Sequence, residues 1–264
     1  MFDVSVLDQK IAGRVDDGAE FSVAGNPSTG FLQWSVAGAA AFVLRDTCPV
    51  VPEGRAPQDL LISGWAVAPY IEFSGSGTSA AVGNSLLKAG VKTELQLFAG
   101  SFFDVQQVQI APYALTDFGF AGRGYGVTVD WIPVSLDAHL NGYIGTADQT
   151  AWWWTFKLNA DALRVDSPGT TGLPTAYYAW AGGKIGLNAK FKVLEKAPAL
   201  TVGADYSFFH DFLGGTNAGL FSAIAKMPLD TSENASLVLD YKIGSDYKTL
   251  QNLNRVKLSL AVKF

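Results

Sequence analysis

A short polar segment near position 210 carries the residue types that hydrolases use for nucleophilic catalysis. Ser207, His210 and Asp211 supply a hydroxyl, an imidazole and a carboxylate. Catalysis requires these groups to form a hydrogen-bonded chain in space, and closeness in sequence does not provide one. The chain has 2 histidines, His139 and His210, so a metal site built on several histidines is not expected. We therefore expect no enzyme activity, no metal and no other cofactor, and a barrel hydrolase is kept as an alternative.

Basic residues at alternating positions indicate a different chemistry, the selection of ions. From residue 151 onward they fall on the polar face of successive segments: Lys157, Lys184, Lys190, Lys192, Lys226, Lys242, Arg255, Lys257 and Lys263. The acids on this face are Asp161, Asp205 and Asp240. A passage lined by an excess of one charge concentrates the opposite ion. The pattern predicts a water-filled channel with a mild anion preference.

The predicted passage is lined by both basic and acidic residues. Those expected to line it are Lys157, Lys190, Lys242, Lys257, Asp205 and Asp240. The lysines could instead pair with acids of the first half of the chain, such as Glu94, Asp130 and Asp137. In that case they would fill a closed interior, as side chains do in small barrels.

Alternating residues predict the strands that would position these charges. In the last segment the apolar positions are Val256, Leu258, Leu260, Val262 and Phe264, with mostly polar residues between them. Successive side chains of a strand point to opposite faces, so a period of two predicts one apolar and one polar face. The same period recurs in residues 136–144, 152–161, 184–193, 200–208 and 236–243. These lengths suit tilted membrane strands of roughly 9 to 11 residues.

The composition favours strands that cross a membrane. Hydrophobic residues make up 48% of the chain and charged residues 16%, and so few charges are unusual for a soluble domain. The longest uncharged stretch, residues 21–44, is interrupted by Asn26 and Pro27 and does not give the roughly 20 apolar residues of a membrane helix. In lipid every backbone polar group needs an internal partner, so amphipathic strands survive there only in a closed barrel.

Charge and cysteine content limit the other classes of function. The net charge of −5 lacks the basic excess of a nucleic-acid surface. The single cysteine, Cys48, permits no disulfide within the chain. We therefore expect no nucleic-acid partner.

Glycine-rich and polar segments predict where strands bend or end. Gly122, Gly124 and Gly126 lack the lysine and the strand-to-helix context of a phosphate loop, so we interpret them as a bend or bulge. Residues 31–44 are predicted as a strand rather than a short helix inside the barrel. Turn-forming residues predict connections at residues 46–59, 74–84, 146–150, 166–175, 194–198, 210–219 and 228–234.

The final segment, residues 256–264, resembles the C-terminal strand of bacterial outer-membrane proteins, because its alternating apolar residues end on Phe264. The resemblance implies that Phe264 and its strand act as an insertion signal for the barrel-assembly machinery. It also implies a location in the bacterial outer membrane, in contact with its lipid. Tryptophans and tyrosines, Tyr178 and Trp180 among them, are interpreted as the aromatic girdles of such a barrel.

We predict one domain over residues 1–264. Its fold class is all-β, a closed antiparallel transmembrane β-barrel of about 12 to 14 strands. The general layout resembles porin-like channels, which implies small polar solutes or anions as partners. Two alternatives stay open: a non-conducting structural or adhesive outer-membrane barrel whose loops bind a partner, and a soluble β-sandwich, where the same alternation would occur.

Overall fold

The computed structural model describes residues 19–26, 31–46, 61–78, 82–98, 102–142, 150–192, 199–229, 235–247 and 251–262. No helix in these ranges is long and apolar enough to cross a membrane. The strands are β1 (Ala19–Asn26), β2 (Phe31–Ala41), β3 (Arg45–Asp46), β4 (Leu61–Thr78), β5 (Val82–Phe98), β6 (Val105–Thr116), β7 (Arg123–Val134), β8 (Ala151–Ser167), β9 (Ala176–Phe191), β10 (Leu200–Asp211), β11 (Asn217–Pro228), β12 (Ala235–Asp246) and β13 (Gln251–Val262).

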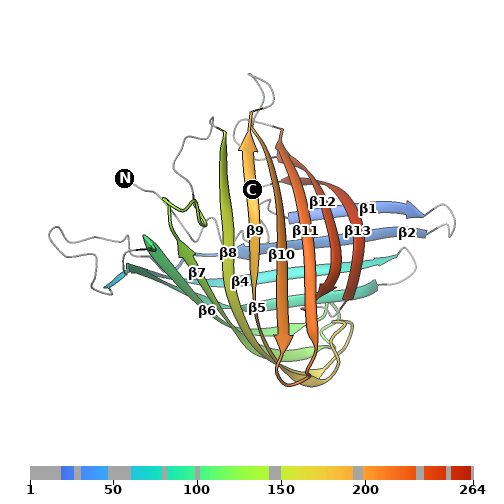
Figure 1. Cartoon of the computed structure of the whole chain (residues 1–264). Coiled ribbons are helices and arrows are strands. Elements are labelled where there is room, and N and C mark those ends of the chain that lie inside the picture. Colours follow the sequence, from blue (N-terminus) through green and yellow to red (C-terminus); the bar gives the residue numbers. More distant parts are fainter. Residues whose placement is uncertain are drawn as a thin grey trace.

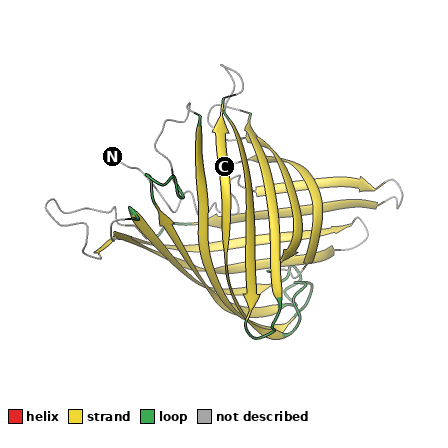
Figure 2. Ribbon diagram, viewed as in Figure 1, coloured by secondary structure: helices red, strands yellow, loops and turns green. Residues whose placement is uncertain are grey.

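All of these strands belong to one antiparallel sheet, in which twelve are long and β3 has 2 residues. From β4 to β13 each strand pairs with the next along the chain. β13 then pairs with β1 over three residue pairs, β1 pairs with β2, and β2 pairs with β4. The sheet curves strongly, so that β8–β13 run at a steep angle to β2, β4 and β5 (Figures 1 and 2). The all-β, antiparallel prediction is confirmed, including the strand in residues 31–41.

The two faces of the sheet follow the predicted alternation. On β8, Trp152, Trp154 and Leu158 are 48%, 41% and 43% exposed. Asn159 and Asp161 on the opposite face of the same strand are each 7% exposed. Because neighbouring strands are in register, these faces continue across the sheet as an apolar outer surface and a polar inner one.

Glycines on the inner face leave room for tyrosines. Tyr70, Gly90, Tyr113 and Gly126 occupy one row across β4 to β7. A Cβ atom on Gly126 would lie 2.7 Å from the Tyr113 hydroxyl and 2.5 Å from the carbonyl oxygen of Ala162. The register shifts between Arg123, which is opposite Ser167, and Gly124, which is opposite Val165. The extra residue is therefore Asp166 of β8, so the irregularity lies on the strand next to the glycine-rich segment and not within that segment.

The strand predicted in residues 136–144 is wrong over its described part, residues 136–142. Residues 136–139 form a turn, flanked by isolated bridges at Ser135 and Leu140. His139 and Asn141 have φ angles of 52° and 53°, which belong to the left-handed region and not to a strand. The Asn141 amide nitrogen donates to two carbonyl oxygens, each 2.6 Å away, and so fixes this turn against β7 and β8.

Two predicted connections are shorter than expected. β4 continues to Thr78 and β5 begins at Val82, within the predicted loop 74–84. β10 and β11 likewise enter the predicted connection 210–219, leaving residues 212–216 between them. Two of the glycines lie within strands and make space: a Cβ on Gly75 would lie 2.6 Å from the Phe118 ring, and one on Gly219 would lie 2.6 Å from the Tyr206 hydroxyl. Gly215, with a φ of 66°, lies in the remaining connection.

Candidate functional site

The inner face is filled by apolar side chains at one end of the sheet. We call this end, where β6–β7, β8–β9 and β10–β11 are joined, the turn end; the described connections gather low in Figure 2. Val165, Leu173, Tyr178, Trp180, Phe209 and Ala218 pack there and are between 1% and 7% exposed. These residues are called the aromatic layer below. Their burial means that these six side chains pack against one another and are themselves shielded from water.

Tyr247, which follows β12, joins the aromatic layer from the far side of the interior. Its ring stacks on Phe209 with centroids 3.8 Å apart, and it lies 5.8 Å from the Trp180 ring. Its hydroxyl donates to the Asn159 side-chain oxygen at 3.1 Å. β8 and β12 are not neighbours in the sheet. Tyr247 therefore links separated strands across the interior.

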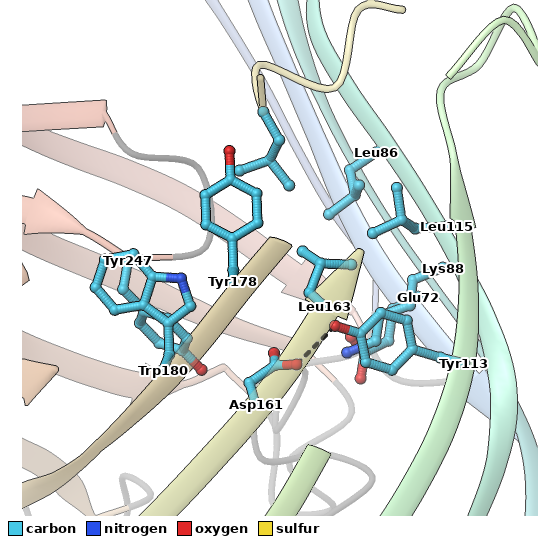
Figure 3. Close-up of a pocket in the computed structure, with 11 residues that line it drawn as sticks. Glu72, Leu86, Lys88, Tyr113, Leu115, Asp161, Leu163, Tyr178, Trp180 and Tyr247 are labelled. Carbon is cyan, nitrogen blue, oxygen red and sulfur yellow. Dashed lines mark hydrogen bonds between the residues drawn. The ribbon is translucent and has the colours of Figure 1, made fainter. Parts of the chain in front are cut away.

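A small cavity lies beside the aromatic layer, with a volume of about 40 Å³ (Figure 3). Its polar wall contains Glu72, Lys88 and Asp161, while leucines and aromatic rings form the rest. The Tyr113 hydroxyl donates to Asp161 at 2.7 Å, and the Lys88 ammonium lies 3.7 Å from the centre of the Tyr113 ring. Such a volume holds only a few water molecules.

A polar network occupies the inner face of β5 to β8. Asp130 accepts from the Lys157 ammonium at 2.6 Å and from the Asn159 amide at 2.5 Å. Glu94, which is 1% exposed, accepts from the Gln109 amide at 2.8 Å. Buried carboxylates require such partners because burial without them is very costly. Asp130 and Glu94 are thus satisfied, whereas the buried hydroxyl of Thr128 on the same face of β7 has no hydrogen-bond partner among the described residues.

Three ion pairs on the inner face share one asymmetry. Their N–O distances are 2.6, 3.0 and 3.0 Å. The pairs, with the exposed fractions of the lysine and acid side chains, are Lys157–Asp130 (39% and 10%), Lys184–Asp205 (47% and 20%) and Lys242–Asp240 (31% and 15%). In each pair the lysine is the more exposed partner. Water and small ions therefore meet mainly the positive member of each pair.

The residues predicted to line a passage all lie on described strands, and most take part in ion pairs. Those in the three pairs above are Lys157, Lys242, Asp205 and Asp240. Lys257 is opposite Asp240 in the sheet, and Lys190 is opposite Thr201; neither lysine is without an interaction partner. The pairing of Lys157 with Asp130 matches the alternative that the sequence left open. Phe264 lies outside the described residues.

Tyr178, Trp180 and Tyr247 are interior residues that sequence reasoning missed. The sequence suggested that Tyr178 and Trp180 belong to an aromatic girdle, but they are 7% and 5% exposed and face inward. β9 is one continuous strand from Ala176 to Phe191. Within one strand, positions 178 and 180 share a face with Lys184. Treating residues 176–191 as one strand would therefore have placed Tyr178 and Trp180 on the inner face with Lys184.

The candidate hydrolase residues do not form a catalytic chain. His210 Nδ1 lies 2.9 Å from the Asn217 side-chain oxygen, and the Ser207 hydroxyl contacts a backbone oxygen at 3.4 Å. Asp211 accepts instead from the backbone N–H groups of Ala179 and Leu213. No group of three or more potential metal ligands occurs among the residues that the structure describes.

Asp117, in the β6–β7 connection, forms hydrogen bonds with the β8–β9 connection at the turn end. One carboxylate oxygen accepts from the Thr170 N–H at 2.7 Å and from its hydroxyl at 3.1 Å. The other accepts from the Ala121 N–H at 2.7 Å. These bonds, led by that of the Thr170 backbone and opposed by burial, lower the pKa of Asp117 from 3.8 to about 2. The charged form of Asp117 thus stabilises the contact between the β6–β7 and β8–β9 connections.

We expect Asp117→Asn to remove part of the acid sensitivity of the fold. Because the folded pKa of Asp117 is the lower one, its stabilising effect is complete above about pH 4 and is lost as the pH falls toward 2. Thermal unfolding in detergent should show a lower midpoint for the variant at pH 7, and this deficit should shrink toward pH 2. Asp137→Asn changes an exposed turn carboxylate and serves as control. A deficit that stays constant from pH 7 to pH 2 would contradict the assignment.

Comparisons with known proteins do not assign the chain to a family. No family model matches it, and no curated protein matches it. One solved chain, from work described as "Unveiling the Mechanism Behind the in-meso Crystallization of Membrane Proteins", is similar with a TM-score of 0.39 and 13% identity. The match covers 92% of this chain and 80% of that one.

Proposed function

We propose that this chain forms a closed transmembrane β-barrel in the bacterial outer membrane and acts as a porin-like channel for small polar solutes or ions, with a mild anion preference. The pairings of β13 with β1, β1 with β2 and β2 with β4 support closure, because they give every long strand two neighbours. Closure would leave no unpaired edge in lipid.

The outer surface of β8 has the dimensions of a membrane-spanning strand. Outward-facing Trp154 and Arg164 are ten residues apart, and Leu158, Ala160 and Ala162 lie between them on the same face. At roughly 3.3 Å per residue and a tilt of roughly 45°, this segment spans roughly 23 Å along the membrane normal. The apolar band of outer-membrane barrels is about 25 Å tall. This agreement supports the membrane assignment.

The unequal exposure of the interior ion pairs is the observation that carries the proposed anion preference. Lys157, Lys184 and Lys242 are two to four times as exposed as their acid partners. Although the charges are paired, the potential at the water-facing surface is then biased toward positive. A positive lining raises the local concentration of anions.

A non-conducting barrel is the second candidate, and the aromatic layer favours it. Buried Tyr178, Trp180 and Phe209 fill the turn end, and Tyr247 crosses the interior to contact two of them. A barrel closed in this way would serve a structural or adhesive role through its loops. Stepwise conductance in planar lipid bilayers supports the channel, while a folded protein that inserts without conducting supports the closed barrel.

Neutralising the exposed lysines is expected to abolish the anion preference. The triple variant Lys157→Gln, Lys184→Gln and Lys242→Gln should shift the reversal potential in a KCl gradient toward zero or toward cation selectivity. Replacing the same lysines by arginine keeps the charge and should leave the reversal potential nearly unchanged. The variant Asp205→Asn with Asp240→Asn should move it in the opposite direction. A cation-selective wild-type channel contradicts the proposed preference.

A further inference from the structure

A group of hydrogen-bond donors lies on the outer surface where the apolar band ends. Arg164 of β8 is directly opposite Tyr125 of β7 and Tyr177 of β9. Its guanidinium carbon lies 5.7 Å from the centre of the Tyr125 ring and 5.1 Å from that of Tyr177. Both rings are largely exposed, at 51% and 62%. The guanidinium is therefore held between two aromatic rings on the outside of the sheet.

Most of the donors in this group have no acceptor within the described part of the chain. Arg164 donates from Nε to Asp166 at 2.6 Å, and no described residue accepts from its two terminal amino groups. Arg123 is exposed at the same end of β7 and forms no ion pair with a described residue. The hydroxyls of Tyr125 and Tyr177 likewise have no described partner. Two arginines against one aspartate leave this group with an excess positive charge.

The position of the group indicates which anion it would meet. Outward-facing Val127, Val129 and Leu158 form the apolar surface next to it and are 37%, 37% and 43% exposed. An arginine facing lipid is far more costly at the middle of the bilayer than near the interface, where the cost almost vanishes. Lipid phosphates lie at that interface, and the planar guanidinium matches a phosphate with two parallel hydrogen bonds.

We propose that Arg164 and Arg123, together with the hydroxyls of Tyr125 and Tyr177, bind the phosphate group of a membrane lipid. This inference rests on the proposed transmembrane barrel and adds a specific lipid contact to it. Asp166 holds the Nε side of the Arg164 guanidinium at 2.6 Å, which leaves the two terminal amino groups for the phosphate. The two rings limit the motion of the guanidinium and so reduce the entropy lost on binding.

Native mass spectrometry of the full chain in detergent micelles tests this site. Micelles are doped with dioleoylphosphatidic acid or with dioleoylglycerol, which has the same tails but no phosphate. The wild-type protein should retain phosphatidic acid and not dioleoylglycerol. Arg123→Gln combined with Arg164→Gln should weaken retention about tenfold or more, as expected from losing charge-assisted hydrogen bonds. Lys184→Gln removes an equally exposed cation from the inner face and should have no effect.

Two further measurements separate a lipid site from simpler explanations. Arg164→Lys keeps the charge but lacks the planar pair of donors, so this variant should also lose most of the retained lipid. If Arg164→Lys retains as much phosphatidic acid as the wild type, the bidentate contact is overturned. Inorganic phosphate at the same concentration should not displace the lipid, and full displacement would identify a site for free phosphate instead. A wild-type protein that inserts and conducts but retains no phosphatidic acid overturns this inference alone, whereas failure to insert overturns the proposed function.

Discussion

Replacing Tyr247 by alanine is expected to raise the single-channel conductance several-fold. The side chain of Tyr247 crosses the interior, stacks on Phe209 at 3.8 Å and bonds to Asn159 at 3.1 Å. Its removal leaves a gap beside a cavity of about 40 Å³ that it already lines. Water would enter this gap, since the adjoining wall contains Glu72, Lys88 and Asp161. Conductance of wild type and variant is compared in the same planar bilayers.

An outward-facing tyrosine on β12, the strand that Tyr247 follows, provides the control for this experiment. Tyr241 of β12 is opposite Val256, which is 69% exposed on the outer surface. Tyr241→Ala should leave the conductance unchanged. Equal conductance of wild type and Tyr247→Ala would show that Tyr247 does not narrow the passage. If the wild type does not conduct and Tyr247→Ala does, Tyr247 is the residue that blocks the passage of a closed barrel.

Replacing Gly126 by valine is expected to produce the largest loss of stability. The new Cβ would lie 2.5 Å from the Ala162 carbonyl oxygen and 2.7 Å from the Tyr113 ring. Ala162 is paired with Val127 in the sheet, so its backbone cannot move without breaking this pairing. Moving Tyr113 would disrupt its hydrogen bond to Asp161. We expect a loss of roughly 1–3 kcal/mol or more in the free energy of unfolding.

Urea unfolding of the protein in detergent micelles measures this loss. Gly119→Val is the matched control, because a Cβ at this turn position has as its nearest contact the Asp117 carboxylate at an ordinary 3.7 Å. The control should unfold near the wild-type midpoint. Equal midpoints for Gly126→Val and wild type would mean that Tyr113 does not pack over Gly126.

The face of each strand could be predicted from sequence because strand geometry imposes a strict period of two. Trp154 and Leu158 were placed outside, and Asn159 and Asp161 inside, by parity alone, and their exposures agree. The same rule failed for Tyr178 and Trp180 because it applies only within one unbroken strand. Aromatic residues suit both a girdle and a packed interior, so their chemical type gave no further help.

The contacts between interior charges could not be predicted from the sequence. Lys157 meets Asp130 because β7 and β8 pair in a register that sets Asp130 opposite Asn159. A shift of this register would give Lys157 a different partner. The turn at residues 136–139 depends similarly on distant atoms, since the Asn141 side chain bonds to Pro133 and Phe156. Alternation along one segment contains no information about such contacts.

The central claim, that the sheet crosses a membrane with its alternating faces toward lipid and interior, is tested most directly by spin labelling along β8. Single cysteines from position 154 to 164, in a background with Cys48 replaced, are labelled with a nitroxide after insertion into lipid vesicles. Oxygen, which enters lipid, should relax the labels at 158, 160 and 162, and a water-soluble nickel chelate should not. Labels at 157, 159 and 161 should show little oxygen accessibility. Strong relaxation of the labels at 158, 160 and 162 by the nickel chelate would contradict the membrane barrel and indicate a soluble sheet.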